Sequence, residues 1–208
     1  MKSLAILGGS GHGKVIADTA LVAGWEEVTF FDDAWPNKSS VGRWSLIGTT
    51  KTLMGSMVDF DAVMVGIGAN RIRLEKYAML AAAGAPLVTL IHPAAVVSAF
   101  AQIGMGSVIC AGAIVNVDAT LGVGIIVNTG ATVDHDCQLA DGVHVAPGAH
   151  LSGDVHVGAG SWIGVGVYVK QGVRIGYDVI VGAGAVVVSD IPDGVTVVGN
   201  PARPIVSK

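Results

Sequence analysis

Residues 127–163 read VNTGATVDHDCQLADGVHVAPGAHLSGDVHVGAGSWI. Every sixth residue of this stretch is Val, Leu or Ile, and the same register continues without a break from Ile91 to Val187. Four residues after each of these positions the side chain is small or β-branched, as at Ala131 and Cys137. A six-residue period with one large and one small inward position is typical of a solenoid of short parallel strands.

Three hexapeptides would close one triangular coil, so the register from 91 to 187 predicts about five coils. Residues one coil apart should stack at about 4.8 Å, the spacing of neighbouring strands. The residue after each large position is often Gly, Asn, Asp or Ala, which suits a turn. A generic β-sandwich fits poorly, because its turns are not spaced so evenly.

The first 90 residues have a different pattern, in which short apolar runs alternate with helical periods. This alternation is typical of parallel βα units. It predicts strands over 4–7, 28–31, 61–67 and 87–91, and helices over 13–23 and 71–83 that are closed by Gly24 and Gly84. We therefore expect an α/β Rossmann-like half-domain over 1–90 and a parallel β-helix with a C-terminal tail over 91–208.

The composition narrows the class of protein. The chain has 208 residues, of which 51% are hydrophobic and 13% charged, with a net charge of −4. High aliphatic content argues against disorder, and the absence of a basic field argues against nucleic-acid binding. No apolar run is long enough to span a bilayer, and Cys110 and Cys137 have no metal or disulfide spacing. We expect a cytoplasmic protein with no metal site.

A glycine-rich loop, Gly-Gly-Ser-Gly-His-Gly over 8–13, joins the first strand to the first helix. Free backbone N–H groups and the helix dipole favour a phosphate there. Asp32 and Asp33 end the second strand, where a carboxylate meets a ribose in dinucleotide folds. Lys14 stands where the last glycine of a G-x-G-x-x-G motif would fall, which argues against NAD.

A second loop, Gly-Ala-Asn over 68–70, follows the third strand at the same sheet edge, with Arg71 and Arg73 beyond it. Together the two loops favour a nucleotide or nucleotide-sugar site. The alternative is that their glycines only make tight turns.

Five of the six histidines lie in or beside the repeat, and His135 is the strongest candidate for a catalytic base. It sits in a turn between Asp134 and Asp136, and a neighbouring carboxylate can fix the imidazole tautomer and raise its basicity. One coil later stands Gly153, whose backbone N–H would be open to a ligand. The alternative is an ordinary surface histidine.

Three further histidines share one repeat phase, at positions 144, 150 and 156, and therefore fall on three successive faces of the prism. That placement keeps them from holding one metal within a subunit. We expect His150 and His156 to be solvated corner residues.

The ordered motifs GGSGHGKVIAD, FDD, GANRIR, NTGATVDHDC, HVAPGAHLSG and VVGNPAR cover essentially the whole chain. Together they resemble the bacterial nucleotide-sugar acetyltransferases of the PglD and NeuD type, within the hexapeptide-repeat acyltransferases. The resemblance implies a left-handed β-helix and acetyl transfer from acetyl-CoA to a sugar amino group, or less often a hydroxyl. It also implies a homotrimer with CoA bound between neighbouring subunits.

The resemblance also implies residue roles. His135 would be the general base and Asp136 its orienting acid, while the Gly153 amide would contact the thioester. His144, Val165 and Ala183 would contact acetyl-CoA. The nucleotide-sugar contacts would fall on Gly11, His12, Gly13, Asp32, Asp33 and Asn70. Ala69 stands where a relative has Asn, so this chain departs from the family pattern in that loop.

Other functions remain open at this point. A γ-type carbonic anhydrase shares the β-helix, but places two histidines five residues apart, whereas the spacings here are 9, 6 and 6. A non-catalytic nucleotide-sugar-binding protein could keep the fold, although the acid-flanked His135 argues against it. The acceptor is also open, because UDP or GDP 4-amino-6-deoxy sugars and free sialic acid all fit the outline.

Overall fold

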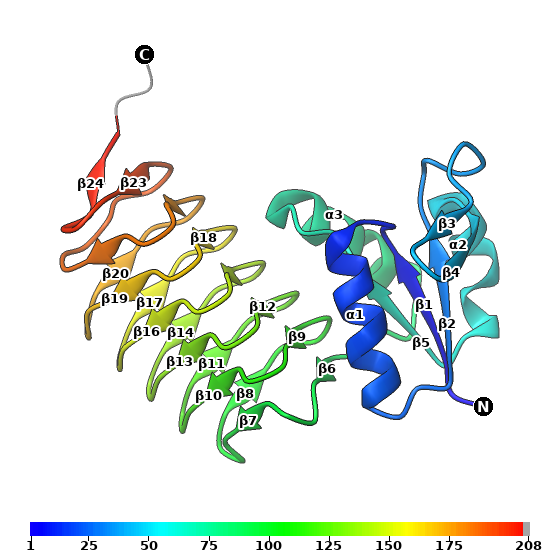
Figure 1. The fold of residues 1–208 in the computed structure, drawn as a ribbon, viewed down its shortest axis with the longest axis horizontal. Coiled ribbons are helices and arrows are strands. Elements are labelled where there is room, and N and C mark those ends of the chain that lie inside the picture. The colour runs from blue at the N-terminus through cyan, green and yellow to red at the C-terminus, as the bar shows by residue number, and fades with distance from the viewer. Residues whose placement is uncertain (206–208) are drawn as a thin grey trace. The chain divides into compact units, whose positions relative to one another are not determined.

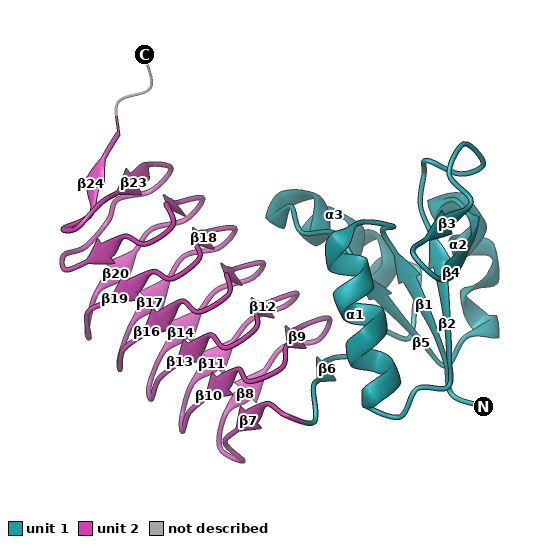
Figure 2. Ribbon diagram, in the orientation of Figure 1, with its two compact units in different colours: residues 1–93 teal, residues 94–208 magenta. Residues whose placement is uncertain are grey.

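The computed structural model describes residues 1–205 and divides the chain into two compact units, Met1–Pro93 and Ala94–Lys208 (Figure 2). The boundary lies three residues beyond the expected one. The two units are described in turn.

The first unit is built on one sheet with the strand order β3-β4-β2-β1-β5 (Figure 1). Its strands are β1 (Ser3–Leu7), β2 (Glu27–Phe31), β3 (Ser40–Val41), β4 (Trp44–Gly48) and β5 (Ala62–Val65), and short β6 (Leu90–Ile91) follows near the end of the unit. Strands β1, β2, β4 and β5 are parallel, while β3 pairs antiparallel with β4. The Rossmann-like prediction is confirmed.

Three α-helices, α1 (Gly11–Val22), α2 (Thr50–Ser56) and α3 (Asn70–Ala82), and the 3-10 turn η1 (Met57–Asp59) complete this unit. Helix α1 starts at Gly11, two residues earlier than expected. The backbone N–H groups of the first turn of a helix have no acceptor within the helix, and glycine is tolerated at these positions. Gly84 follows α3 with φ of +76°, as the sequence predicts for a helix-closing glycine.

Two parts of the first unit differ from expectation. The strand expected over 87–91 is reduced to an isolated bridge from Leu87 to Val63 and the two residues of β6. No strand or helix is predicted from the sequence between residues 31 and 61, where the structure has β3, β4 and α2.

The second unit is a three-sided parallel β-helix of two-residue strands (Figure 1). One face holds β7 (Val96–Val97), β10 (Ile114–Val115), β13 (Thr132–Val133), β16 (His150–Leu151), β19 (Tyr168–Val169) and β22 (Val186–Val187). A second face holds β8 (Gln102–Ile103), β11 (Thr120–Leu121), β14 (Gln138–Leu139), β17 (His156–Val157) and β20 (Arg174–Ile175).

The third face holds β9 (Val108–Ile109), β12 (Ile126–Val127), β15 (His144–Val145), β18 (Trp162–Ile163), β21 (Ile180–Val181) and β23 (Thr196–Val198). Strand β24 (Arg203–Pro204) pairs antiparallel with β23. From β7 to β22 stacked partners are 18 residues apart, as in the pairs Val115–Val133 and Val133–Leu151, whereas β21 and β23 pair at a spacing of 16, as in Val181–Val197. The 18-residue coil is therefore confirmed.

The large and small positions of the repeat both point inward. From Ile109 to Val187 every large member is buried, and so are the small members between them, including Cys137. The first coil is less buried, and Ile91 is 41% exposed. Because the interior is continuous and apolar, each coil is held by the coils above and below it.

A regular turn conformation accompanies this core. Every sixth residue from Gly106 to Gly184 has a positive φ, between 49° and 72°. These residues are glycine except at four turns, where they are Asp118, Asp136, Asp154 and Asp178. Glycine, asparagine and aspartate tolerate this left-handed conformation best. The left-handed residue stands three positions after each large residue of the repeat. The sequence pattern predicts the turn one position after the large residue, which is two positions earlier.

Candidate active site

His135 lies in the turn between β13 and β14, where one nitrogen of its imidazole is hydrogen-bonded and the other, within the described part of the chain, is not. Its Nδ1 is 2.7 Å from Oδ2 of Asp136, and its backbone N–H donates to Oδ1 of Asp134 at 2.9 Å. Asn116 in turn donates to the same Asp134 oxygen at 2.8 Å. With Nδ1–H donated to Asp136, Nε2 carries the lone pair and is free of any partner among residues 1–205.

The acids around His135 make it a better base. Its pKa is raised, chiefly by the hydrogen bond that it donates to Asp136 and further by the charges of Asp134, Asp136 and Asp154, while the loss of hydration opposes the rise. The side chain is exposed, so its Nε2 is accessible to a substrate. The arrangement is that of an imidazole ready to accept a proton.

Gly153 lies one coil above His135, as the stacking argument predicts. A Cβ built on Gly153 would overlap the imidazole at Cε1 and Nε2 and would lie 3.0 Å from Nδ1, so only glycine leaves room for the ring. The Gly153 carbonyl accepts from Gly172 N–H at 3.0 Å, whereas the Gly153 N–H has no acceptor among the described residues. An open N–H beside a base is a donor available to a developing oxyanion.

A hollow of about 490 Å³ opens at this edge of the prism. It is lined by Asp134, His135, Ser152, Gly153, Asp154, Gln171 and Gly172. The structure thus brings His135, Asp136 and Gly153 together, as the sequence predicts.

The residues expected to contact acetyl-CoA lie elsewhere on the same prism. His144 is on β15 of another face and only 4% exposed, with its Nε2 3.1 Å from Nδ2 of Asn128 and its ring centroid 4.0 Å from that of Trp162. Val165 and Ala183 lie on stacked turns, between β18 and β19 and between β21 and β22. Within one chain these three residues are therefore not on the edge that carries His135.

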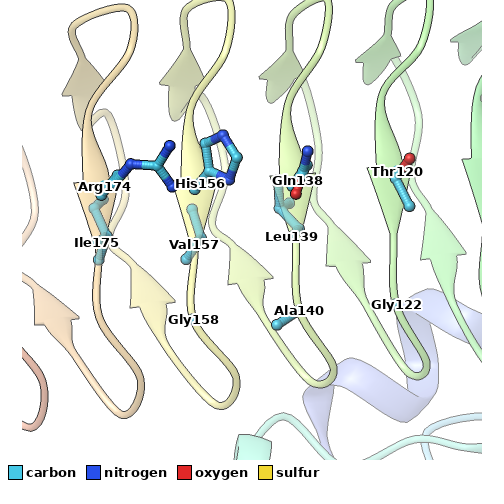
Figure 3. A pocket seen from close by; sticks show the side chains of 10 residues that line it. All are labelled: Thr120, Gly122, Gln138, Leu139, Ala140, His156, Val157, Gly158, Arg174 and Ile175. Carbon is cyan, nitrogen blue, oxygen red and sulfur yellow. The ribbon is translucent and has the colours of Figure 1, made fainter.

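A second hollow, of about 670 Å³, lies on the face formed by β11, β14, β17 and β20. Figure 3 shows Thr120, Gln138, His156 and Arg174 projecting from successive strands of this face. His156 Nε2 is 3.2 Å from Asp154 Oδ1, and on the neighbouring face His150 Nδ1 is 2.9 Å from Thr132 Oγ1. The expectation of solvated corner histidines was therefore wrong: both lie on strands, partly buried and hydrogen-bonded, because their repeat phase is the outward position of each strand.

In the first unit, the two expected carboxylates have different contacts. Asp32 accepts from the backbone N–H of Gly9 at 2.6 Å and of Ala34 at 2.9 Å, and so fastens the glycine-rich loop. Asp33 accepts from Thr50 N–H and Oγ1 at 2.8 Å and from Lys76 Nζ at 3.1 Å. Partial burial raises the pKa of Asp33, but these hydrogen bonds and the Lys76 charge outweigh it, so the pKa is lowered overall.

A pocket of about 170 Å³ adjoins both carboxylates at the carboxyl end of the parallel strands. It is lined by Leu7, Gly8, Asp32, Asp33, Thr50, Ile67, Ile72 and Lys76. Ligands of open α/β sheets bind at this edge. Thr50 and Lys76 were not expected from the sequence, since only the fold places them beside Asp33.

The loop residues Gly11, His12 and Gly13 form the first turn of α1, and Asn70 is the first residue of α3. A Cβ on Gly13 would overlap the carbonyl of Gly8, whereas Gly11 has open space around it. Gly13 is therefore required for close packing, and Gly11 lies on the accessible side of the loop. Burial, with the Arg73 charge, lowers the pKa of His12 to about 4, so His12 is neutral near pH 7.

Across residues 1–205, no cluster of three or more His, Cys, Asp or Glu side chains could hold a metal ion. In the same range, no helix has the length and apolarity needed to cross a membrane.

Comparison with known proteins adds independent evidence. The PglD N-terminal domain family model matches residues 3–80. The acetyltransferase domain of PglB from Neisseria gonorrhoeae, solved in complex with acetyl coenzyme A, is 47% identical to this chain, with a TM-score of 0.94 over 98% of this chain and 99% of that one. The chain belongs to the PglD family of sugar acetyltransferases.

Two further relatives are in the same family. PerB from Caulobacter crescentus, solved in complex with CoA and GDP-perosamine, is 37% identical with a TM-score of 0.93 over 99% of this chain and 98% of that one. UDP-N-acetylbacillosamine N-acetyltransferase of Bacillus subtilis is 40% identical over 120 residues, which is 53% of this chain and 52% of the relative. The match thus spans about half the length of that curated protein.

Membership of the PglD family confirms the expected fold, with its left-handed β-helix. The placement of the histidines argues against the alternative of a γ-type carbonic anhydrase. A carbonic anhydrase needs histidines gathered on one metal, whereas here His135, His144, His150 and His156 lie apart on an edge and three faces of the prism.

Proposed function

We propose that this chain transfers the acetyl group of acetyl-CoA to the amino group of a nucleotide-linked amino sugar, a UDP- or GDP-4-amino-6-deoxy sugar. The observation that carries the proposal is the stack of Gly153 over His135, with Nδ1 of the imidazole tied to Asp136. The 47% identity to a domain solved with acetyl coenzyme A supports the donor, and a relative solved with CoA and GDP-perosamine supports the acceptor class.

The proposed chemistry is direct attack. The acceptor amine forms a C–N bond to the thioester carbon while Nε2 of His135 takes its proton. The oxygen of the tetrahedral intermediate accepts from the Gly153 N–H, an interaction worth about 2.7–4 kcal/mol in a known oxyanion hole. The C–S bond then breaks, and the proton held on His135 passes to the departing CoA thiolate.

A covalent acetyl-enzyme has no suitable nucleophile among the cysteines. Burial raises the pKa of the Cys110 thiol to about 12 and of the Cys137 thiol to about 11. Cys137 also faces the prism interior, where its Sγ lies 3.2 Å from the carbonyl of Ser152. Both thiols remain protonated near pH 7, and a thiol is a much weaker nucleophile than a thiolate.

The first unit supplies the binding site for the nucleotide. The start of α1, where the helix dipole favours an anion, suits a pyrophosphate, and the pocket beside Asp32 and Asp33 lies at the same sheet edge. Of the matched residues, Gly11, His12, Asp33 and Asn70 would face the ligand, while Gly13 would permit the close packing of the loop and Asp32 would hold its shape through Gly9.

We further propose that the active enzyme is a homotrimer in the cytoplasm, where acetyl-CoA is available. His135 lies on one edge of the prism, whereas Val165 and Ala183 lie on another. An acetyl-CoA molecule that contacts both His135 and the edge with Val165 and Ala183 therefore requires two subunits. The Val165 and Ala183 edge of one subunit must face the His135 edge of its neighbour. A cyclic trimer of prisms repeats such a contact at each interface.

The full chain, incubated with acetyl-CoA and a panel of UDP- and GDP-linked amino sugars, provides the test. CoA release is measured with a thiol reagent, and mass spectrometry of the product shows a gain of one acetyl group. Matched sugars with a hydroxyl in place of the amine, and free sialic acid, distinguish O-acetylation. Nucleotide-sugar binding without CoA release from any acceptor would favour the non-catalytic alternative.

A further inference from the structure

Arg73 of α3 is the largest fully buried side chain among residues 1–205, with 1% of its surface exposed. Its neighbour Arg71 has a side chain that is 90% exposed and pairs with Glu75 at 3.3 Å. The two arginines of the GANRIR motif therefore differ completely in their surroundings. A buried guanidinium is costly unless several hydrogen bonds hold it.

The guanidinium of Arg73 bridges one short loop. Nη1 donates to the carbonyls of Ile67 at 3.2 Å and Gly68 at 2.8 Å, and Nη2 donates to Oδ1 of Asn70 at 3.0 Å. These three acceptors fall within four successive residues, 67–70. A planar fork of donors can satisfy them together, whereas the single ammonium of lysine cannot match the same geometry.

The loop that Arg73 holds is part of the proposed nucleotide site. Ile67 lines the pocket that also contains Asp33, and Asn70 is one of the residues matched to nucleotide contacts. The hydrogen bond that Asn70 Oδ1 accepts from Arg73 Nη2 fixes which way the Asn70 amide faces.

Arg73 also acts on the other loop of the site. Burial and, to a smaller extent, the charge of Arg73 lower the pKa of His12 in the first turn of α1 to about 4. Burial lowers the pKa of Arg73 itself to about 10, which leaves the guanidinium charged at neutral pH.

We propose that Arg73 is the positioning residue of the acceptor site, whose guanidinium sets the shape of the 67–70 loop and the orientation of Asn70 for the nucleotide of the sugar substrate. This inference rests on the proposed function. The residues that Arg73 holds belong to the proposed nucleotide site, so its effect should fall on acceptor binding.

Titration calorimetry on the full chain with UDP, with GDP and, separately, with acetyl-CoA tests this role. The variants are Arg73→Lys, which keeps the charge but loses the fork, and Arg73→Met, which loses both. Arg71→Met is the matched control on the same helix. Thermal unfolding of each variant shows whether it is folded, and Arg73→Lys serves if Arg73→Met is not.

We expect both Arg73 variants to bind the preferred nucleotide about tenfold more weakly or worse, because hydrogen bonds to a charged group are lost. The dissociation constant for acetyl-CoA should change by less than about twofold, and Arg71→Met should match the unaltered protein. In turnover, the acceptor KM should rise while kcat at saturating acceptor is kept. A residue that only stabilises the fold would not produce this split.

If a folded Arg73 variant bound the nucleotide as tightly as the unaltered protein, the role of Arg73 would be refuted while the proposed function would stand. The same would follow if its affinities for the nucleotide and for acetyl-CoA fell equally. An unaltered protein that binds acetyl-CoA but neither UDP nor GDP would instead overturn the proposed nucleotide site, and the inference with it.

Discussion

At the scale of single residues, His135 carries the chemistry that separates an acetyltransferase from a binding protein. His135→Ala should lower kcat by roughly 100-fold or more, because the other titratable side chains beside it are the carboxylates Asp134, Asp136 and Asp154, which are much weaker bases than an imidazole. Both KM values should change little. The measurement is steady-state CoA release, with His150→Ala as the control because His150 contacts Thr132 on a strand and does not line the hollow beside His135. A His135→Ala enzyme with near-normal kcat would refute the assignment and make His144 the next candidate.

Asp136 has two roles that can be separated by substitution. Its carboxylate raises the pKa of His135, and its backbone has a φ of 60°. Asp136→Asn keeps a residue type that tolerates this conformation but removes the charge. The pKa of His135 should then fall, so the acidic limb of the kcat/KM profile should move to lower pH.

The plateau of the Asp136→Asn profile should also fall, though by less than for His135→Ala, because the imidazole is less basic. A pH–rate profile from pH 5 to 9 checks both effects. Asp136→Gly, which also suits the backbone, is the matched control and should show the same direction of shift. An acidic limb that stays in place would show that Asp136 does not set the basicity of His135.

At the scale of the element, the left-handed turn residue is what lets each hexapeptide change direction. Gly130 has a φ of 64°, and a Cβ there would meet nothing within 4 Å. Gly130→Ala should therefore lower the free energy of unfolding by about 1–2 kcal/mol through backbone strain alone. Gly130→Asn should cost less, as the chain itself uses Asp at four equivalent turns.

Denaturant unfolding of the two Gly130 variants measures this difference. Equal stability of the Ala and Asn variants would mean that the turn relaxes and that the left-handed residue does not direct the solenoid.

At the scale of the whole molecule, the separation of the proposed acetyl-CoA contacts onto two edges predicts sites shared between subunits. Light scattering should give three times the mass of the chain. His135→Ala and Ala183→Trp should each be nearly inactive alone, because each damages one half of every site. Refolding the two together should restore about one quarter of normal activity, since that fraction of interfaces joins two intact halves.

Each Ala183→Trp or His135→Ala preparation refolded by itself is the control for that mixing experiment. A monomeric mass, or no recovered activity in the mixed trimers, would place the whole site within one chain.

A feature of this protein follows from its sequence when the pattern that determines it lies within a short stretch of the chain. The hexapeptide register alone determined which side chains fill the β-helix, because burial there repeats every six residues along the chain. The same arithmetic placed Gly153 over His135, and simple adjacency placed Asp136 at its Nδ1. Gly84 ended its helix as expected, since a C-terminal glycine acts through local backbone conformation.

Only the tertiary structure decided the rest, because those features depend on contacts between residues distant in sequence. Arg71 and Arg73 look alike in the motif, yet folding exposes one and buries the other beneath a loop that it holds. Lys76 reaches Asp33 across 43 positions, and Asp32 turns to the Gly9 N–H instead of presenting both oxygens to a ligand. The separation of His135 from Val165 and Ala183 likewise appears only when the coils close into a prism with distinct edges.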